Sequence, residues 1–176
     1  GAHAVVEVTN PTSFDPQVVM QFFETTTRNL MEAEKAAGVG HHLAVSIVGT
    51  DRVPDSGYLR AKMAQEAAIV AGGVPYTILR ATQFFEFLGM IVDTSTQDGV
   101  ARLTNAKLQP VAAEDGAEAL FHAVLAPPVN GVVELAGPEA LGLDELGRRV
   151  LAAKGDGRKV VTDPEARYFG ALLNDG

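Results

Sequence analysis

A tyrosine and a lysine stand four residues apart in this sequence, at positions 58 and 62. On a helix this spacing places two side chains on one face, with their Cβ atoms about 5 to 6 Å apart. A nearby ammonium group favours the ionised form of a phenol and so lowers the phenol's pKa toward neutral pH. We therefore expect Tyr58 to donate or accept a proton, with Lys62 supplying the positive charge.

A serine precedes this pair by twelve residues, at position 46. Each of the three residues also has a purely structural interpretation. Tyr58 can be a helix-start residue whose ring covers the core, and Ser46 can be a buried strand residue bonded to backbone. Lys62 on its own is an ordinary solvated lysine. The catalytic interpretation depends on the pair beginning a helix directly after the strand that carries Ser46.

Alternating strands and helices are expected to position these residues. Three short apolar runs are typical of strands that are buried on both faces of a parallel sheet. Asp15 followed by Pro16 predicts the start of the first helix, and Gly38 predicts its end. The predicted order is strand, helix, strand, helix, strand, over residues 4–8, 16–37, 43–48, 58–71 and 75–79.

The rest of the chain continues this alternation. Helices are predicted over residues 83–92, 117–125 and 143–153, a fourth buried strand over 132–135 and a short strand over 159–161. The pattern predicts an α/β fold, a doubly wound parallel sheet with right-handed crossovers. In such a sheet, ligands bind beyond the carboxyl ends of the strands. Ser46 and the residues after the first and third strands therefore lie where a site is expected.

Composition and charge exclude several classes of function. The absence of cysteine excludes disulfides, thiolate metal sites and a cysteine nucleophile. A net charge of −8 without a Lys/Arg cluster argues against a nucleic-acid partner and leaves a small molecule as the expected one. No apolar run reaches the roughly 18 residues of a membrane span, and the first residues lack a secretory pattern, so we expect a cytoplasmic protein without a membrane partner.

Two adjacent histidines, His41 and His42, raise the question of a metal site. Neighbouring residues at the start of a strand point to opposite faces, and no third ligand lies nearby in the sequence. We expect no metal.

At Ser46, Tyr58 and Lys62 the sequence resembles the short-chain dehydrogenase/reductase superfamily, whose signature is Y-x-x-x-K on a helix with a serine about a dozen residues upstream. Longer stretches resemble its extended and atypical, NmrA-like branch: residues 27–33, 75–80, 109–111 and 131–138. The resemblance implies a partial Rossmann-like fold that begins at the family's fourth strand. We expect a single partial domain over residues 1–176, in which residues 139–176 contribute to the substrate side.

The resemblance also implies an activity. It points to an NAD(P)-dependent oxidoreductase that reduces or oxidises a small carbonyl, alcohol or quinone-like substrate, with NADP or NAD as cofactor. Tyr58 would be the general acid/base, Lys62 would bind the nicotinamide ribose, and Ser46 would hold the substrate carbonyl. The alternatives are a non-catalytic NmrA-like redox sensor and, less favoured because no basic cluster suits a diphosphate, a sugar-nucleotide epimerase or dehydratase.

Further site residues follow from the same resemblance. Asn10 and Pro11 come after the first strand, where family members run their backbone past the cofactor, although a plain turn is equally consistent with them. Thr82 and Gln83 follow the third strand, where the family lines its nicotinamide pocket. An apolar substrate cavity is indicated by three nearby aromatic residues, Phe84, Phe85 and Phe87, which can also be simple core.

The sequence departs from the family pattern in two ways. A glycine-rich turn before the first helix is absent, and Gly38 and Gly40 lie at the wrong end of a helix to bind a pyrophosphate. We therefore expect about three strands to be missing upstream, which leaves the first strand as a hydrophobic edge that favours self-association and weakens dinucleotide binding. In addition, the family's helix asparagine falls near Phe23 here.

Overall fold

The computed structural model describes residues 1–173 and divides the chain into two compact units. The sheet unit comprises Gly1–Ala81 and Glu114–Leu135, and the second unit comprises Thr82–Ala113 with the chain from Ala136 onward. The second unit therefore takes residues from both sides of the last helix and strand of the sheet unit.

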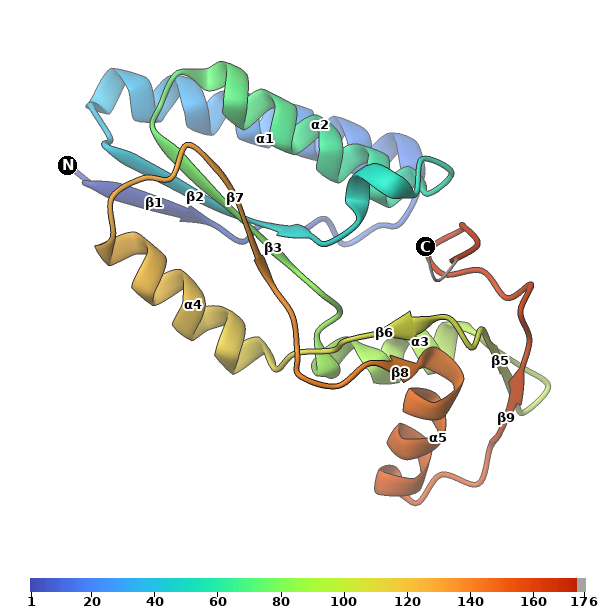
Figure 1. Ribbon diagram of the computed structural model, residues 1–176. Coiled ribbons are helices and arrows are strands. Elements are labelled where there is room, and N and C mark those ends of the chain that lie inside the picture. Colours follow the sequence, from blue (N-terminus) through green and yellow to red (C-terminus); the bar gives the residue numbers. More distant parts are fainter. Residues whose placement is uncertain (174–176) are drawn as a thin grey trace. The chain divides into compact units, whose positions relative to one another are not determined.

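Four parallel strands form the centre of the sheet unit, in the order β1-β2-β3-β7. Helices α1 and α2 cover one face of this sheet and α4 covers the other (Figure 1). The elements are β1 (Ala4–Glu7), α1 (Pro16–Ala37), β2 (His41–Ile47), α2 (Gly57–Gly72), β3 (Tyr76–Ala81), α4 (Ala113–Leu125) and β7 (Gly131–Leu135), with a 3-10 turn at Thr50–Arg52. The predicted doubly wound parallel α/β fold is confirmed.

Local capping explains where α1 begins and ends. The Asp15 carboxylate accepts hydrogen bonds from the backbone N–H of Gln17 and of Val18, at 2.9 and 3.1 Å, and proline occupies the first turn. Gly38 ends the helix with φ +68°, in the left-handed region that favours glycine. Both predicted helix boundaries are confirmed.

Close packing of α1 on α2 fixes the position of the first turn of α2. Val19 and Phe23 of α1 are fully buried against Ala61 of α2. Gly57 lies where a Cβ would stand 2.6 Å from the Cβ of Pro16, so the two helices approach each other at a glycine. The residue after this contact is Tyr58.

The prediction of a buried strand at residues 132–135 is wrong in its burial. The strand exists as β7, but Val132 and Val133 are 43% and 42% exposed. In the described part of the chain β7 pairs with β3 alone, so it is an edge strand rather than a central one. The opposite edge is β1, as predicted, and Val6 is exposed there.

The second unit packs two helices against short strands. Its elements are a 3-10 turn at Phe85–Phe87, α3 (Leu88–Thr94), β4 (Thr96–Gln97), β5 (Val100–Leu103), β6 (Lys107–Leu108), β8 (Leu141–Gly142), α5 (Leu143–Lys154) and β9 (Lys159–Thr162). Strands β4, β5 and β9 form one sheet, and β6 pairs with β8. The helix predicted over 83–92 begins only at Leu88, and the pairs β4-β5 and β6-β8 were not predicted, because such short strands have no clear periodicity.

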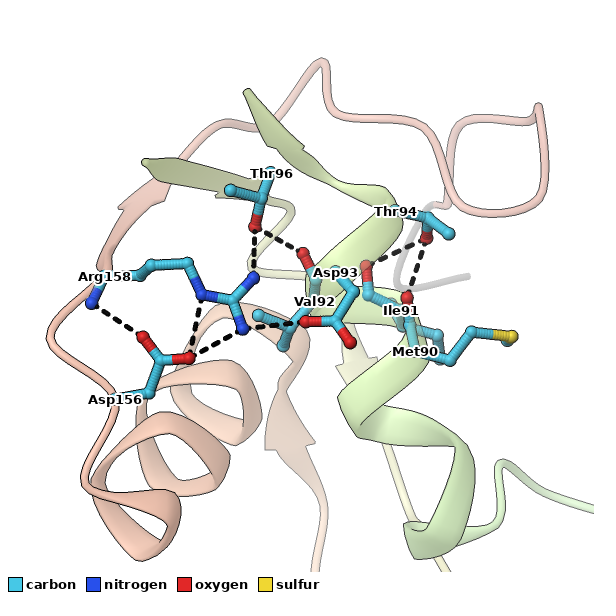
Figure 2. Close-up of polar contacts among 8 residues, drawn as sticks. All are labelled: Met90, Ile91, Val92, Asp93, Thr94, Thr96, Asp156 and Arg158. Atoms are coloured by element: carbon cyan, nitrogen blue, oxygen red, sulfur yellow. Dashed lines mark hydrogen bonds and ion pairs between the residues drawn. The ribbon is translucent and has the colours of Figure 1, made fainter. Parts of the chain in front are cut away.

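Arg158 links the end of α3 to the turn before β9 (Figure 2). Its guanidinium group donates to Asp93 at 2.7 Å, to Asp156 at 2.9 Å and to Thr96 at 3.2 Å. Thr96 in turn donates to the carbonyl of Val92 at 2.7 Å. These contacts join segments that are more than sixty residues apart in the sequence.

Candidate active site

Tyr58 stands in the first turn of α2, with its hydroxyl group at the carboxyl end of β1. The phenol donates a hydrogen bond to the side-chain oxygen of Asn10, which follows β1, at 2.9 Å. Its ring contacts those of Phe14 and Phe23, with centroid separations of 6.0 and 6.3 Å. Pro11, next to Asn10, is half-buried. The structure thus brings Asn10 and Tyr58 together at the end of the sheet where ligands of such folds bind.

The expectation of a lowered phenol pKa is wrong. Burial raises the pKa of Tyr58 above its ordinary value of 10.0, because the phenolate is poorly solvated there. The phenol is consequently protonated throughout the neutral pH range.

Lys62 turns into the core of the sheet unit, which explains why it does not lower that pKa. Its ammonium group donates to the carbonyl oxygen of Val45 at 2.7 Å and to the side-chain oxygen of Gln65, and it lies 4.5 Å from the centre of the Phe23 ring. Burial lowers the pKa of Lys62 to about 8, although the negative charges of Glu7 and Glu66 act to raise it.

Phe23 occupies the position where the resemblance places the family's helix asparagine. Its ring is fully buried, with Tyr58 against it edge-on and Lys62 above it. A phenyl ring neither donates nor accepts the hydrogen bonds that an amide would offer, so this position carries no polar relay. Tyr58 and Lys62 are connected through an aromatic contact instead.

Ser46 takes part in a second buried network. Its hydroxyl donates to the Glu66 carboxylate at 2.5 Å. Arg80 donates to both oxygens of Glu66, at 3.0 and 2.7 Å, and to Asp51 at 3.1 Å. Glu66 lies two helical turns after Tyr58 on α2. The hydroxyl of Ser46 is therefore bonded to Glu66 and not to the phenol of Tyr58. The spacing of residues in the sequence gave no means to predict Glu66 as this partner.

The remaining predicted site residues belong to the second unit. Thr82 donates to the carbonyl of Gln109 at 2.5 Å. Gln83 donates to the carbonyl of Phe84 at 3.0 Å and accepts from the hydroxyl of Tyr168. Tyr168 was not singled out from the sequence, because it lies 85 residues from Gln83.

The three predicted substrate-binding aromatics are not part of the core. Phe84 forms an isolated bridge with Val111 and its ring lies 6.5 Å from that of Phe87. Phe85 and Phe87 are 48% and 47% exposed. Two of the three rings are thus exposed on the second unit, and their substrate-lining role stays a prediction.

His41 and His42 face opposite sides of the sheet, as predicted. His41 contacts the hydroxyl of Thr77 at 2.9 Å, whereas His42 contacts both oxygens of Glu34 on α1 at 3.0 Å. Within residues 1–173 no group of three or more His, Cys, Asp or Glu side chains is arranged to hold a metal ion. The helices of the same range include none that is long and apolar enough to cross a membrane.

The nicotinamide ribose and the pyrophosphate of a dinucleotide need different groups from a protein. Asn10 and Tyr58 offer polar groups at the carboxyl end of β1, which suits a nicotinamide ribose. A pyrophosphate needs free backbone N–H groups at a helix N-terminus. At α1 those groups are bonded to the Asp15 carboxylate, which repels an anion. The N-terminus of α1 therefore does not offer a pyrophosphate site.

Comparison with known proteins gives structural matches only. Sequence comparison finds no matching family model and no matching curated protein. Among solved structures, the chain is similar to the NADPH-dependent quinone oxidoreductase QOR2 of Escherichia coli, with 22% identity and a TM-score of 0.65. That match covers 88% of this chain and 60% of the other. The chain has part of a Rossmann-like fold.

Two further structures extend this result. The Citrobacter triphenylmethane reductase complexed with NADP(H) matches with 22% identity and a TM-score of 0.68, over 94% of this chain and 57% of its own. The Streptomyces venezuelae dTDP-glucose 4,6-dehydratase DesIV, with NAD bound, matches with 19% identity and a TM-score of 0.71, over 99% of this chain and 65% of its own. The chain thus spans about 60% of the length of the proteins it resembles.

Proposed function

We propose that this protein is an NAD(P)-dependent oxidoreductase of the short-chain dehydrogenase/reductase type, acting on a small carbonyl, alcohol or quinone-like substrate. The observation that carries the proposal is the hydrogen bond between Tyr58 and Asn10 at the carboxyl end of β1. The fold, shared with solved NAD- and NADPH-bound enzymes, supports it. The cofactor would be NADP or NAD.

The protonation state of Tyr58 favours the reductive direction. A bound nicotinamide supplies the hydride. Tyr58 would give its hydroxyl proton to the carbonyl oxygen of the substrate. Burial raises the pKa of Tyr58, so the proton is present at neutral pH. In the structure this proton is donated to Asn10, so the hydroxyl has to turn from Asn10 to the substrate before the transfer.

The other predicted site residues receive roles in this proposal. In the sheet unit, Asn10, Pro11 and Lys62 would contact the cofactor, for which the ammonium group of Lys62 has to leave Val45 and Gln65. Thr82 and Gln83 of the second unit keep their predicted role as cofactor contacts. The aromatic side chains Phe84, Phe85 and Phe87 would line the substrate. Ser46 would hold the substrate carbonyl, for which its hydroxyl has to leave Glu66.

A second function is supported by a specific observation. Both Lys62 and Ser46 are hydrogen-bonded inside the core, to Val45 and Glu66 among others. A protein that holds a dinucleotide without turning it over, as a redox sensor does, needs neither side chain free. The two functions differ in one measurable property, which is turnover.

Replacing Tyr58 by phenylalanine tests the enzymatic proposal. Tyr58→Phe removes the proton donor, and we expect NADPH-dependent reduction of small quinones and aldehydes to fall by about 10²- to 10⁴-fold. Tyr76→Phe, a tyrosine on β3, is the matched control and is expected to retain turnover. Undiminished turnover by Tyr58→Phe contradicts the assignment. Cofactor binding without any turnover by the unaltered protein supports the sensor instead.

A further inference from the structure

Five polar side chains form a continuous chain through the core of the sheet unit. They come from α2, β1, β2 and α1, and none is more than 4% exposed: Lys62, Gln65, Glu7, His42 and Glu34. Side chains of this kind are rarely buried unless each one has a partner.

Each member of this buried chain contacts the next. Lys62 donates to the side-chain oxygen of Gln65, and the Gln65 side chain is close enough to Glu7 to help lower the pKa of that carboxylate. His42 follows, with its Nε2 atom at an ion-pair distance of 3.5 Å from Oε2 of Glu7, and neither of these two buried atoms has a hydrogen-bond partner among the described residues. The opposite ring nitrogen of His42, Nδ1, lies 3.0 Å from both oxygens of Glu34. Contact is therefore unbroken from the α2 lysine to the α1 glutamate.

Charges of opposite sign alternate along this buried chain of side chains. Burial by itself lowers the pKa of His42, but the hydrogen bond with Glu34 and the charges of Glu34 and Glu7 outweigh burial and raise it. Burial by itself raises the pKa of Glu7, but the proximity of His42 and the hydrogen bond from Thr9 outweigh burial, so the pKa of Glu7 is lowered. When protonated, His42 favours the ionised form of Glu7, and ionised Glu7 raises the pKa of Lys62, which is bonded to Gln65.

Lys62 leads from this charged chain to Tyr58. Its ammonium group lies over the face of the Phe23 ring, and Tyr58 packs edge-on against the same ring. A cation is attracted to an aromatic face, whereas a neutral amine is not. The charge on Lys62 therefore helps to hold the ring that supports the phenol.

We propose that Glu7 is a positioning residue for Tyr58: it keeps Lys62 charged, and charged Lys62 holds Phe23 against the phenol ring. The inference rests on the proposed function, because it concerns how the proton donor of that function is placed. Two carboxylates face Lys62, Glu7 from β1 and Glu66 from its own helix. Glu66 is bonded at both oxygens to Arg80, which leaves Glu7 as the stronger influence on Lys62.

NMR titration of the whole chain tests this coupling without any need for turnover. Three tyrosines are present, so the Tyr58 ring signals are assigned with Tyr58→Phe. In the unaltered protein we expect those signals to change at the pH where Lys62 loses its proton, near 8, and the signals of Tyr76 and Tyr168 to stay constant. Lys62→Met is expected to abolish the change. A Tyr58 signal that ignores the Lys62 titration overturns the proposal.

Glu7→Gln tests the role of the carboxylate itself. Removing its charge is expected to shift the Lys62 titration to lower pH, and the Tyr58 inflection with it. The expected shift is about one pH unit, which is a tenfold change in the protonation equilibrium. Glu32→Gln, an exposed glutamate on α1, is the matched control and leaves both unchanged. An unshifted titration in folded Glu7→Gln overturns the proposal. If Glu7→Gln does not fold in buffer, it and the unaltered protein are both titrated in sucrose, which favours the folded state, and the same shift decides.

The two proposals fail separately. Retained turnover by Tyr58→Phe removes the enzymatic role of the phenol and leaves the titration result standing. An absent inflection removes the role of Glu7 and leaves the activity of Tyr58 untouched.

Discussion

Phe23 shows how one residue changes the meaning of a motif. Tyr58 and Lys62 have the spacing of a catalytic pair, yet the ammonium group faces an aromatic ring and a backbone carbonyl rather than the phenol. The phenol in turn has a raised pKa, set by burial. The pair therefore acts through packing as well as through charge, and a variant at either position is expected to report on both.

Lys62 is expected to reduce stability at neutral pH. Its pKa is about 8 in the folded protein and 10.5 ordinarily, so between these values the unfolded chain binds more protons and stability rises with pH. We predict that the unaltered protein gains about 3 kcal/mol over Lys62→Met between pH 7 and pH 10.5. Urea unfolding at several pH values measures this gain, with Lys35→Met, on the exposed side of α1, as control. A constant difference contradicts a lowered lysine pKa.

At the scale of elements, the contact of α1 with α2 sets where the first turn of α2 lies. Gly57→Ala places a Cβ 2.6 Å from the rigid ring of Pro16, so the helices must separate. We expect a loss of about 1 to 3 kcal/mol in the free energy of unfolding, together with altered Tyr58 ring signals. The control is Gly157→Ala, which meets no atom within 4 Å. Unchanged stability of Gly57→Ala would show that the helices yield at this contact.

The contacts of Arg158 are expected to stabilise the second unit. Arg158→Met removes the contacts that join the end of α3 to the turn before β9, so we expect the Tm to fall by several degrees. Arg102→Met is the matched control, because Arg102 is 62% exposed and its ion pair with Asp163 spans 3.9 Å. Equal effects of the two variants in a thermal scan would show that the geometry at Arg158 adds nothing.

The scale of elements is also where sequence reasoning was most successful. Asp15, Pro16 and Gly38 determine the bounds of α1 through contacts with close neighbours in the chain, so local patterns were enough. Partners distant in sequence were not predicted. Tyr58 with Asn10 and Gln83 with Tyr168 meet only after folding, 48 and 85 residues apart. The prediction that β7 is buried failed for the same reason, because strand order decides which apolar strand becomes an edge.

At the scale of the whole molecule, β1 and β7 form the two edges of the described sheet. An exposed edge strand with apolar side chains pairs readily with another chain. We predict concentration-dependent association, measured by sedimentation, that Val6→Lys on β1 reduces. Val18→Lys, at a comparably exposed position on α1, is the control and leaves it unchanged. A monomer at all concentrations contradicts this prediction.

The divided second unit has a consequence for folding during synthesis. Leu88 and Leu103 emerge from the ribosome early, but the core that covers them includes Leu146, Leu151 and Tyr168. Strand β5 likewise waits for β9, which lies almost sixty residues further on. Until then this apolar surface is open to chaperones, whereas β1, β2 and β3 of the sheet unit have already been translated and are able to pair.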